Sequence, residues 1–124
     1  MPALTDYARN LVARALVGRS PALPNVVFVG LGTSATAAAG LTGEPVANGY
    51  ARAQATFTGT GAQRNAETLR FAFTAASGTL THLGLFDAQS GGNAIAFAPL
   101  NASVVVAGAG TVTIAAEALV LDGT

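Results

Sequence analysis

The sequence has 124 residues, enough for one domain over 1–124 and too few for a catalytic domain beside a separate substrate domain. Only 10% of the residues are charged, against roughly a quarter in an average soluble domain, and the formal net charge is zero. The low charge and the absence of lysine argue against nucleic-acid binding. The absence of cysteine excludes disulfides and thiolate metal sites.

The first predicted element is an amphipathic helix over about residues 5–17. Its apolar side chains, including Leu11 and Leu16, recur at helical spacing, and polar side chains fall opposite them. Thr5 is a candidate N-cap and Gly18 a candidate stop. Because an isolated helix of this length is marginal in water, we expect it to pack on the domain or on a neighbouring subunit.

From residue 25 onward the apolar pattern becomes that of strands. Residues 25–31 are predicted to form the first strand, and residues 32–48 a long surface loop with room for one helical turn at 35–39. Further strands are predicted at 50–57, 67–73, 80–87, 94–100, 103–107, 111–115 and 118–121. This pattern predicts a mainly β fold, an antiparallel β-sandwich resembling a jelly roll over about 25–122, with one N-terminal helix.

The segment VVFVGLGTSA, from Val26 to Ala35, is similar to a strand entering the Gly-x-Gly turn of a dinucleotide-binding fold. That chemistry needs a following helix and an acidic residue about 20 positions further on. Gly40, Gly43 and Pro45 interrupt any such helix, and Arg52 stands near the acidic position. We therefore interpret the segment as a strand leaving through a glycine turn, and we predict no cofactor.

No group of side chains predicts a catalytic or metal site. His82 is the only histidine, and strand alternation puts it on one face with Leu80 and Gly84. Asp87 follows five residues later and so faces the opposite side of that strand. No serine lies in a Gly-x-Ser-x-Gly elbow. We expect His82 to be a packed structural residue, and we expect no enzymatic activity.

Several short strings are similar to those of the short tailed-phage proteins known as phage tail fibre proteins, which are virion structural or decoration proteins. They cover nearly the whole chain: LTDY at 4–7, GYAR at 49–52, TF at 56–57, THLGLFDA at 81–88, GGN at 91–93 and AG at 107–108. The resemblance implies a structural role in the virion. Strands of five to eight residues span only a few tens of Å, so we expect a capsid-decorating subunit or a short head or tail appendage.

We expect this protein to act in an assembly of its own copies, for which a trimer is one arrangement. A weakly charged surface and a modest set of large core side chains favour burial between subunits. The predicted interface residues are Leu11 and Leu16 on the helix, and Tyr50 and Arg52 after the long loop. Capsid or tail proteins of the virion are the other predicted partners.

The second hypothesis is a receptor- or carbohydrate-binding module on the particle surface, because long loops on a β framework often carry contacts. An enzyme ranks third. The start of the chain has no basic segment followed by an apolar core, and no apolar run approaches about 18 residues. We therefore expect synthesis in the cytoplasm of the bacterial host, no membrane insertion and a final place in the virion.

Overall fold

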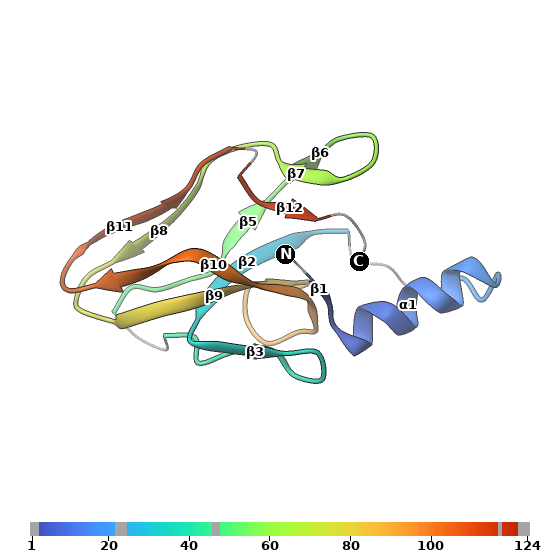
Figure 1. Cartoon of the computed structure of the whole chain (residues 1–124), viewed down its shortest axis with the longest axis horizontal. Helices are drawn as coiled ribbons and strands as arrows, with labels where there is room; N and C mark the ends of the chain where they lie inside the picture. Colours follow the sequence, from blue (N-terminus) through green and yellow to red (C-terminus); the bar gives the residue numbers. More distant parts are fainter. Residues whose placement is uncertain (1–2, 22–24, 46–47, 117, 122–124) are drawn as a thin grey trace.

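The computed structural model describes residues 3–21, 25–45, 48–116 and 118–121, which form a mainly β fold with one helix near the N-terminus (Figure 1). The elements are α1 (Asp6–Leu16), β1 (Ala3–Leu4), β2 (Val27–Gly32), β3 (Ser34–Thr36), β4 (Gly40–Thr42), β5 (Ala53–Ala55), β6 (Phe57–Thr58), β7 (Gln63–Asn65), β8 (Leu69–Phe73), β9 (Gly78–Phe86), β10 (Ala94–Val106), β11 (Gly110–Ile114) and β12 (Val120–Leu121). All their pairings are antiparallel, which confirms the predicted class. Residues 1–2 and 122–124 of the predicted domain lie outside the described residues.

Helix α1 begins where the sequence predicts, at the Thr5 cap. The Thr5 hydroxyl accepts a hydrogen bond from the backbone N of Ala8 at 3.3 Å and donates one to the carbonyl oxygen of Ala94, at the start of β10, at 2.6 Å. The Thr5 residue is only 2% exposed. One side chain therefore both caps the helix and fastens it to the sheet.

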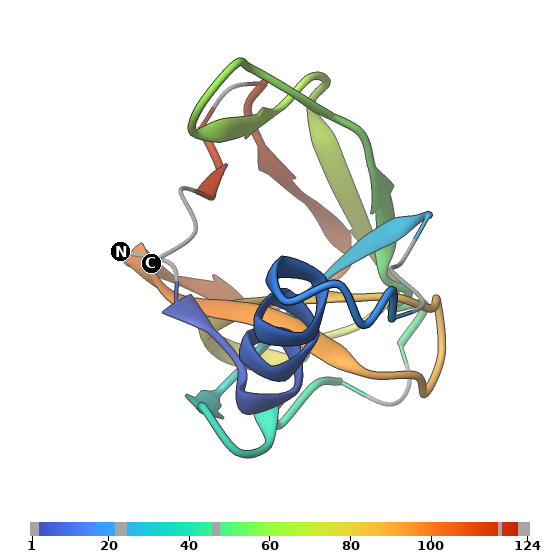
Figure 2. The same cartoon turned by 90° about the vertical axis from the view of Figure 1, so that its right-hand side faces the viewer.

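The second half of α1 leaves the body of the protein at the right of Figure 1, and in Figure 2 this helix points toward the viewer in front of the sheets. Ala8 and Leu11 are buried, whereas Val12, Leu16 and Val17 are 45%, 81% and 75% exposed. The predicted apolar face is thus buried in the first turns and uncovered in the last ones.

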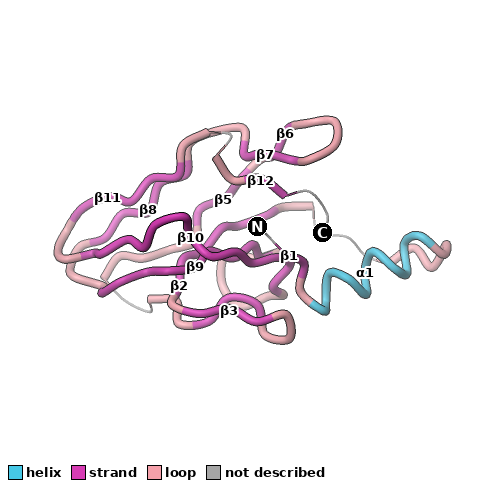
Figure 3. Tube along the Cα trace, in the orientation of Figure 1, coloured by secondary structure: helices cyan, strands magenta, loops and turns pink. Residues whose placement is uncertain are grey.

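The largest sheet has five strands in the order β1-β10-β9-β2-β5 (Figure 3). Strand β9 lies at its centre, paired with β10 on one side and with β2 on the other. Three smaller antiparallel sheets, β11-β8, β12-β7-β6 and β3-β4, accompany it.

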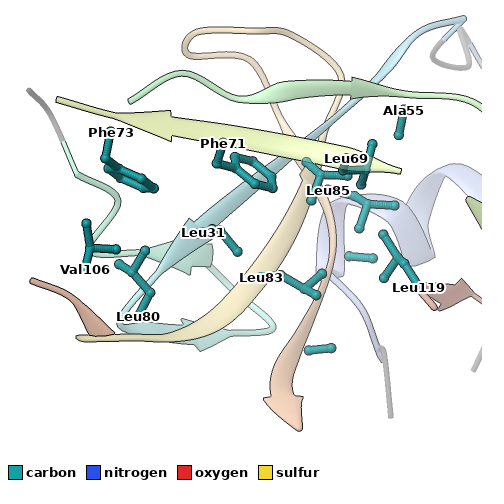
Figure 4. Packing of buried hydrophobic residues seen from close by; sticks show 13 residues of the cluster. Leu31, Ala55, Leu69, Phe71, Phe73, Leu80, Leu83, Leu85, Val106 and Leu119 are labelled. Carbon is teal, nitrogen blue, oxygen red and sulfur yellow. The ribbon is translucent and has the colours of Figure 1, made fainter. Parts of the chain in front are cut away.

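The hydrophobic core lies between one face of the five-stranded sheet and strand β8 (Figure 4). Strand β8 alternates as predicted, with Leu69, Phe71 and Phe73 buried and the residues between them exposed. Val29 and Leu31 of β2 belong to the same cluster and have no exposed surface. Since each such side chain contributes about 1.5–3 kcal/mol when fully buried, this layer is the main source of stability.

The opposite face of the same sheet carries glycines at its centre. Gly30 of β2 pairs directly with Gly84 of β9, and Gly32 lies two residues further along β2. A Cβ atom at Gly84 would lie 2.5 Å from the Cβ of Leu41, and one at Gly30 would lie 2.5 Å from Oε2 of Glu44. We call these three glycines the glycine strip. Their bare backbone lets the following segment lie directly on the sheet, so the glycines of VVFVGLGTSA lie within a strand and not in a turn.

The prediction of a loop over 32–48 with a helical turn at 35–39 is wrong in its middle part, where β3 and β4 pair as a hairpin. The turn covers residues 37–39, and Gly40, with φ 73°, begins the returning strand. Leu41 follows and is 6% exposed. The alanine and threonine residues of this segment form no alternating pattern of apolar and polar side chains. The hairpin is positioned by the burial of Leu41 on the glycine strip.

Strand boundaries also differ from prediction at three places. The strand predicted over 50–57 is divided into β5 and β6, which belong to different sheets. The two strands predicted at 94–100 and 103–107 form the single strand β10. Strand β7 was not predicted, because its sequence, Gln63-Arg64-Asn65, has no apolar side chain.

A bulge in β10 explains why one long strand has the sequence pattern of two. Pro99 pairs with His82 and Val104 with Leu80, so five residue steps of β10 lie opposite two of β9. Leu80 and Leu83 both lie in the core, so the alternation predicted around His82 also breaks at this point. Proline, which has no N–H to donate, stands where the regular ladder ends.

Replacing Gly30 by alanine is expected to destabilise the protein by about 1–3 kcal/mol, because the methyl group would overlap the Glu44 carboxylate and the Tyr50 hydroxyl. Gly61→Ala is the matched control, since a Cβ there meets nothing within 4 Å. Urea unfolding followed by circular dichroism measures both. The same unfolding midpoint for both variants would contradict the role given to the glycine strip.

Candidate functional site

Arg52 connects two loops that are far apart in the sequence. Its Nη2 and Nε donate to Oε1 and Oε2 of Glu44 at 2.7 and 3.0 Å, and its Nη1 donates to the carbonyl oxygens of Ala88 and Gly91, both at 2.9 Å. The guanidinium also lies over the ring of Phe86, 3.5 Å from its centroid. Only the planar fork of an arginine can satisfy the carboxylate and both carbonyls together.

Tyr50 links this arrangement to the sheet and to the core. Its hydroxyl donates to Oε2 of Glu44 at 2.6 Å and accepts from the backbone N of Leu31 at 2.9 Å. Its ring stacks with those of Phe71 and Phe73, at centroid distances of 6.4 and 5.9 Å. We call Glu44, Tyr50 and Arg52, with the carbonyl groups that Arg52 binds, the Arg52 clamp.

The clamp is largely withdrawn from solvent. The side chains of Arg52 and Glu44 are 10% and 20% exposed. Burial raises the pKa of Tyr50 well above its usual value, and its hydrogen bond to Glu44 raises that pKa further. Removing one member of a buried ion pair typically costs about 3–5 kcal/mol, because the other charge is left without its partner. The clamp is thus suited to holding separate segments in a fixed arrangement.

The loop that presents the two carbonyl groups is closed by its own side chains. Oδ1 of Asp87 accepts from the backbone N of Asn93 at 2.7 Å, and Oδ2 accepts from the Asn93 side-chain amide at 3.1 Å. Gly91 and Gly92 have φ values of 63° and 70°, a left-handed conformation that suits glycine. The strings THLGLFDA and GGN therefore build the acceptor side of the clamp.

An open polar pocket of about 400 Å³ lies beside the clamp. Glu44 and Arg52 line it together with Gln89 and Ser90, which are exposed residues of the 87–93 loop. These amide and hydroxyl groups could donate and accept hydrogen bonds with a polar ligand.

The four predicted interface residues do not form one surface. Tyr50 and Arg52 come together in the clamp, where their polar groups bind residues of the same chain. Leu11 is buried, while Leu16 is exposed at the projecting end of α1. That these residues contact other subunits stays a prediction, and the exposure of Leu16 makes it the strongest candidate.

Glu44, the partner of Arg52, is not among the residues predicted from the sequence. The sequence does contain a feature that indicates this pair: Glu44 is the only charged residue between Arg19 and Arg52. A lone carboxylate in an uncharged segment needs either solvent or a cation, and Arg52 is the next cation in the chain. Asn65 was also missed. Its side chain is fully buried and binds three backbone groups, of Glu67, Ala115 and Leu119.

His82 lies apart from the clamp in a small polar contact of its own. The hydroxyl of Thr81 donates to the carbonyl oxygen of Thr33 at 2.8 Å and lies 2.8 Å from Nδ1 of His82. Because the hydroxyl has one proton, His82 Nδ1 is the donor in the second contact. Within the described residues, no three histidine or acidic side chains lie close enough together to hold a metal ion.

The fold and the clamp define a structural β module, in which the main polar cluster binds the chain's own loops. No helix in the described part of the chain is long and apolar enough to cross a membrane. The family model of the podophage GP4 fiber I protein gp80 matches residues 3–122, nearly the whole sequence. The chain therefore belongs to this family of phage fibre proteins and is a structural component of a virion. No curated protein matches it.

Tyr50→Phe is expected to change how stability depends on pH. The raised pKa means that folded Tyr50 keeps its proton where the unfolded chain releases it, near the ordinary value of 10.0. The resulting stabilisation is complete below that pH and is lost as the pH rises above it. The phenylalanine variant should be less stable at pH 7 by about 1 kcal/mol, because it lacks the hydrogen bonds, and its stability should fall less above pH 10.

Urea unfolding between pH 7 and pH 11 measures this effect. The Tyr7→Phe variant, which retains Tyr50, is the control and should show the same alkaline fall as the unchanged protein. Parallel falls in all three proteins would contradict the assignment to Tyr50.

Proposed function

We propose that this protein is a homo-oligomeric β-sandwich subunit of a short fibre, appendage or capsid decoration on the podophage particle, without enzymatic activity. The observation that carries the proposal is the uncovered apolar end of α1. A helix end with an 81% exposed leucine gains stability when another surface covers it.

The charge distribution supports association with protein and not with nucleic acid. The chain has six basic residues and a formal net charge of zero, so copies repel one another weakly. Arg52 is engaged in the clamp, and Arg9 lies near Asp6, at 4.0 Å. We propose a trimer as the oligomer and capsid or tail proteins as the other partners, after synthesis in the cytoplasm of the bacterial host.

A second candidate function is binding of a receptor or carbohydrate at the particle surface. The observation that favours it is the open polar pocket beside the clamp, which offers the side chains of Gln89 and Ser90. Hydrogen-bonding side chains around a shallow pocket suit a hydroxyl-rich ligand.

Light scattering of the purified protein, over a concentration series at neutral pH, tests the first proposal. We expect a stable mass of three monomers, because the covered helix ends stabilise the complex. A monomer at every concentration would contradict self-association. The same preparation, applied to a glycan array beside a Gln89→Ala/Ser90→Ala variant, tests the second candidate. Binding that the variant lacks would favour it.

A further inference from the structure

The guanidinium of Arg52 has one N–H group that binds nothing among the described residues. An arginine side chain has five N–H donors. Nε and one N–H of Nη2 bind the Glu44 carboxylate, and the two N–H groups of Nη1 bind the carbonyl oxygens of Ala88 and Gly91. The second N–H of Nη2 therefore remains for a ligand in the polar pocket of about 400 Å³ that Arg52 lines.

The planar guanidinium fixes the direction of this N–H group. Nε and Nη2 direct one edge of the guanidinium at Glu44, so the remaining N–H of Nη2 lies on the edge shared with Nη1. A ligand atom that accepts it lies close to a carbonyl oxygen that Nη1 already binds. A hydroxyl group suits this position, because its oxygen can accept from Arg52 while its proton is donated to that carbonyl. A carboxylate or phosphate oxygen has no proton to donate and would be repelled by the carbonyl.

The charges of this pocket cancel. Glu44 and Arg52 are the only charged residues in its described lining, and Oε1 and Nη2 of the two side chains are 2.7 Å apart. A negatively charged ligand would meet the Glu44 carboxylate, and a positively charged one would meet the guanidinium. The Arg52 side chain is only 10% exposed, so solvent and salt screen these charges weakly. The pocket therefore favours an uncharged ligand.

Two exposed side chains in the lining supply further hydrogen-bonding groups. The amide of Gln89 and the hydroxyl of Ser90 can each donate and accept. Their loop is fixed before any ligand binds, because the Asp87 carboxylate binds Asn93 across its base and Arg52 holds two of its carbonyl groups. Such preorganisation lowers the entropy loss that binding must offset.

The size and the remaining lining of the pocket suit the ring of a sugar. Pro45 and Ala51 add aliphatic surface, on which the C–H groups of a sugar ring can pack. The volume of about 400 Å³ lies in the range of roughly 300–1,000 Å³ that is typical of small-ligand sites. Because the pocket is open, the rest of a glycan chain can extend into solvent.

We propose that this pocket binds one neutral sugar residue of a surface glycan. One ring hydroxyl accepts from Nη2 of Arg52 and donates to a loop carbonyl that Nη1 binds. Gln89 and Ser90 bind the neighbouring hydroxyl groups. This inference rests on the second candidate function, binding of a receptor or carbohydrate, and names its ligand class. It excludes sugars that carry a carboxylate, sulfate or phosphate group on the bound ring.

Titration of the ¹⁵N-labelled protein with pairs of small glycosides, followed by NMR, tests the ligand class. Each pair consists of a neutral methyl pyranoside of glucose, galactose or mannose and its uronate, in which a carboxylate replaces the hydroxymethyl group. We expect at least one neutral glycoside to shift the backbone amide signals of Gln89, Ser90 and Gly91. Its uronate should bind at least tenfold more weakly, because the carboxylate meets Glu44 and the loop carbonyls.

A pair of double variants tests the position of the site. Gln89→Ala/Ser90→Ala should bind the neutral glycoside about tenfold more weakly, the loss expected for two hydrogen bonds. Gln54→Ala/Ser34→Ala removes the same two kinds of side chain at exposed positions of β5 and β3, and it should bind as the unchanged protein does.

The outcomes separate this inference from the function on which it rests. Equal or tighter binding of the uronates, or equal binding by the two double variants, would overturn the neutral-sugar site and leave carbohydrate binding in place. A glycan array that shows binding while no neutral glycoside binds would do the same. If neither the glycosides nor the array show any binding, both the ligand class and the second candidate function fail.

Discussion

The ion pair between Arg52 and Glu44 lies beside a strip of sheet that carries no side chains. Because Gly30 and Gly84 are paired at the sheet centre, the Glu44 carboxylate and Leu41 can approach the backbone closely. The carboxylate then holds Arg52, and Arg52 holds the loop between β9 and β10. The central sheet is consequently covered on both faces, with apolar side chains on one and the hairpin and clamp on the other.

This construction separates the part of the protein that binds residues of its own chain from the exposed apolar end of α1. The residues of the core, the glycine strip and the clamp contact other residues of the same chain, while the last turns of α1 leave Val12 and Leu16 exposed. A buried ion pair contributes little net stability, but it favours one arrangement of its loops over others.

The sequence predicts those elements whose signal is local. Thr5 and the helical spacing predict α1, and the alternation of Leu69, Phe71 and Phe73 predicts β8. The β3-β4 hairpin has no such signal, because its position depends on Leu41 meeting glycines of two other strands. A periodic pattern cannot show contacts of this kind.

The same limit applies to the site. The sequence predicts Tyr50 and Arg52 as interface residues, which stays a prediction; it does not predict that their polar groups bind Glu44 and loop carbonyls of the same chain. Two oppositely charged residues eight positions apart do not reveal a buried pair unless the backbone between them turns back. Here Gly49, with φ 77°, provides part of that turn. The sequence also does not predict that the second half of α1 projects from the body. Helical spacing indicates an apolar face, but it does not indicate which part of that face is covered.

Hydrogen exchange of an Arg52→Ala variant, compared with Arg9→Ala, tests most directly whether one side chain holds these segments together. Arg9 is the control because its contact with Asp6 is exposed and contributes at most about 1 kcal/mol. We predict that Arg52→Ala speeds exchange at the amide of Leu31, in residues 48–52 and in residues 88–93 together, while β8 stays protected and Arg9→Ala changes none of them. Faster exchange confined to the immediate neighbours of residue 52 would contradict the clamp.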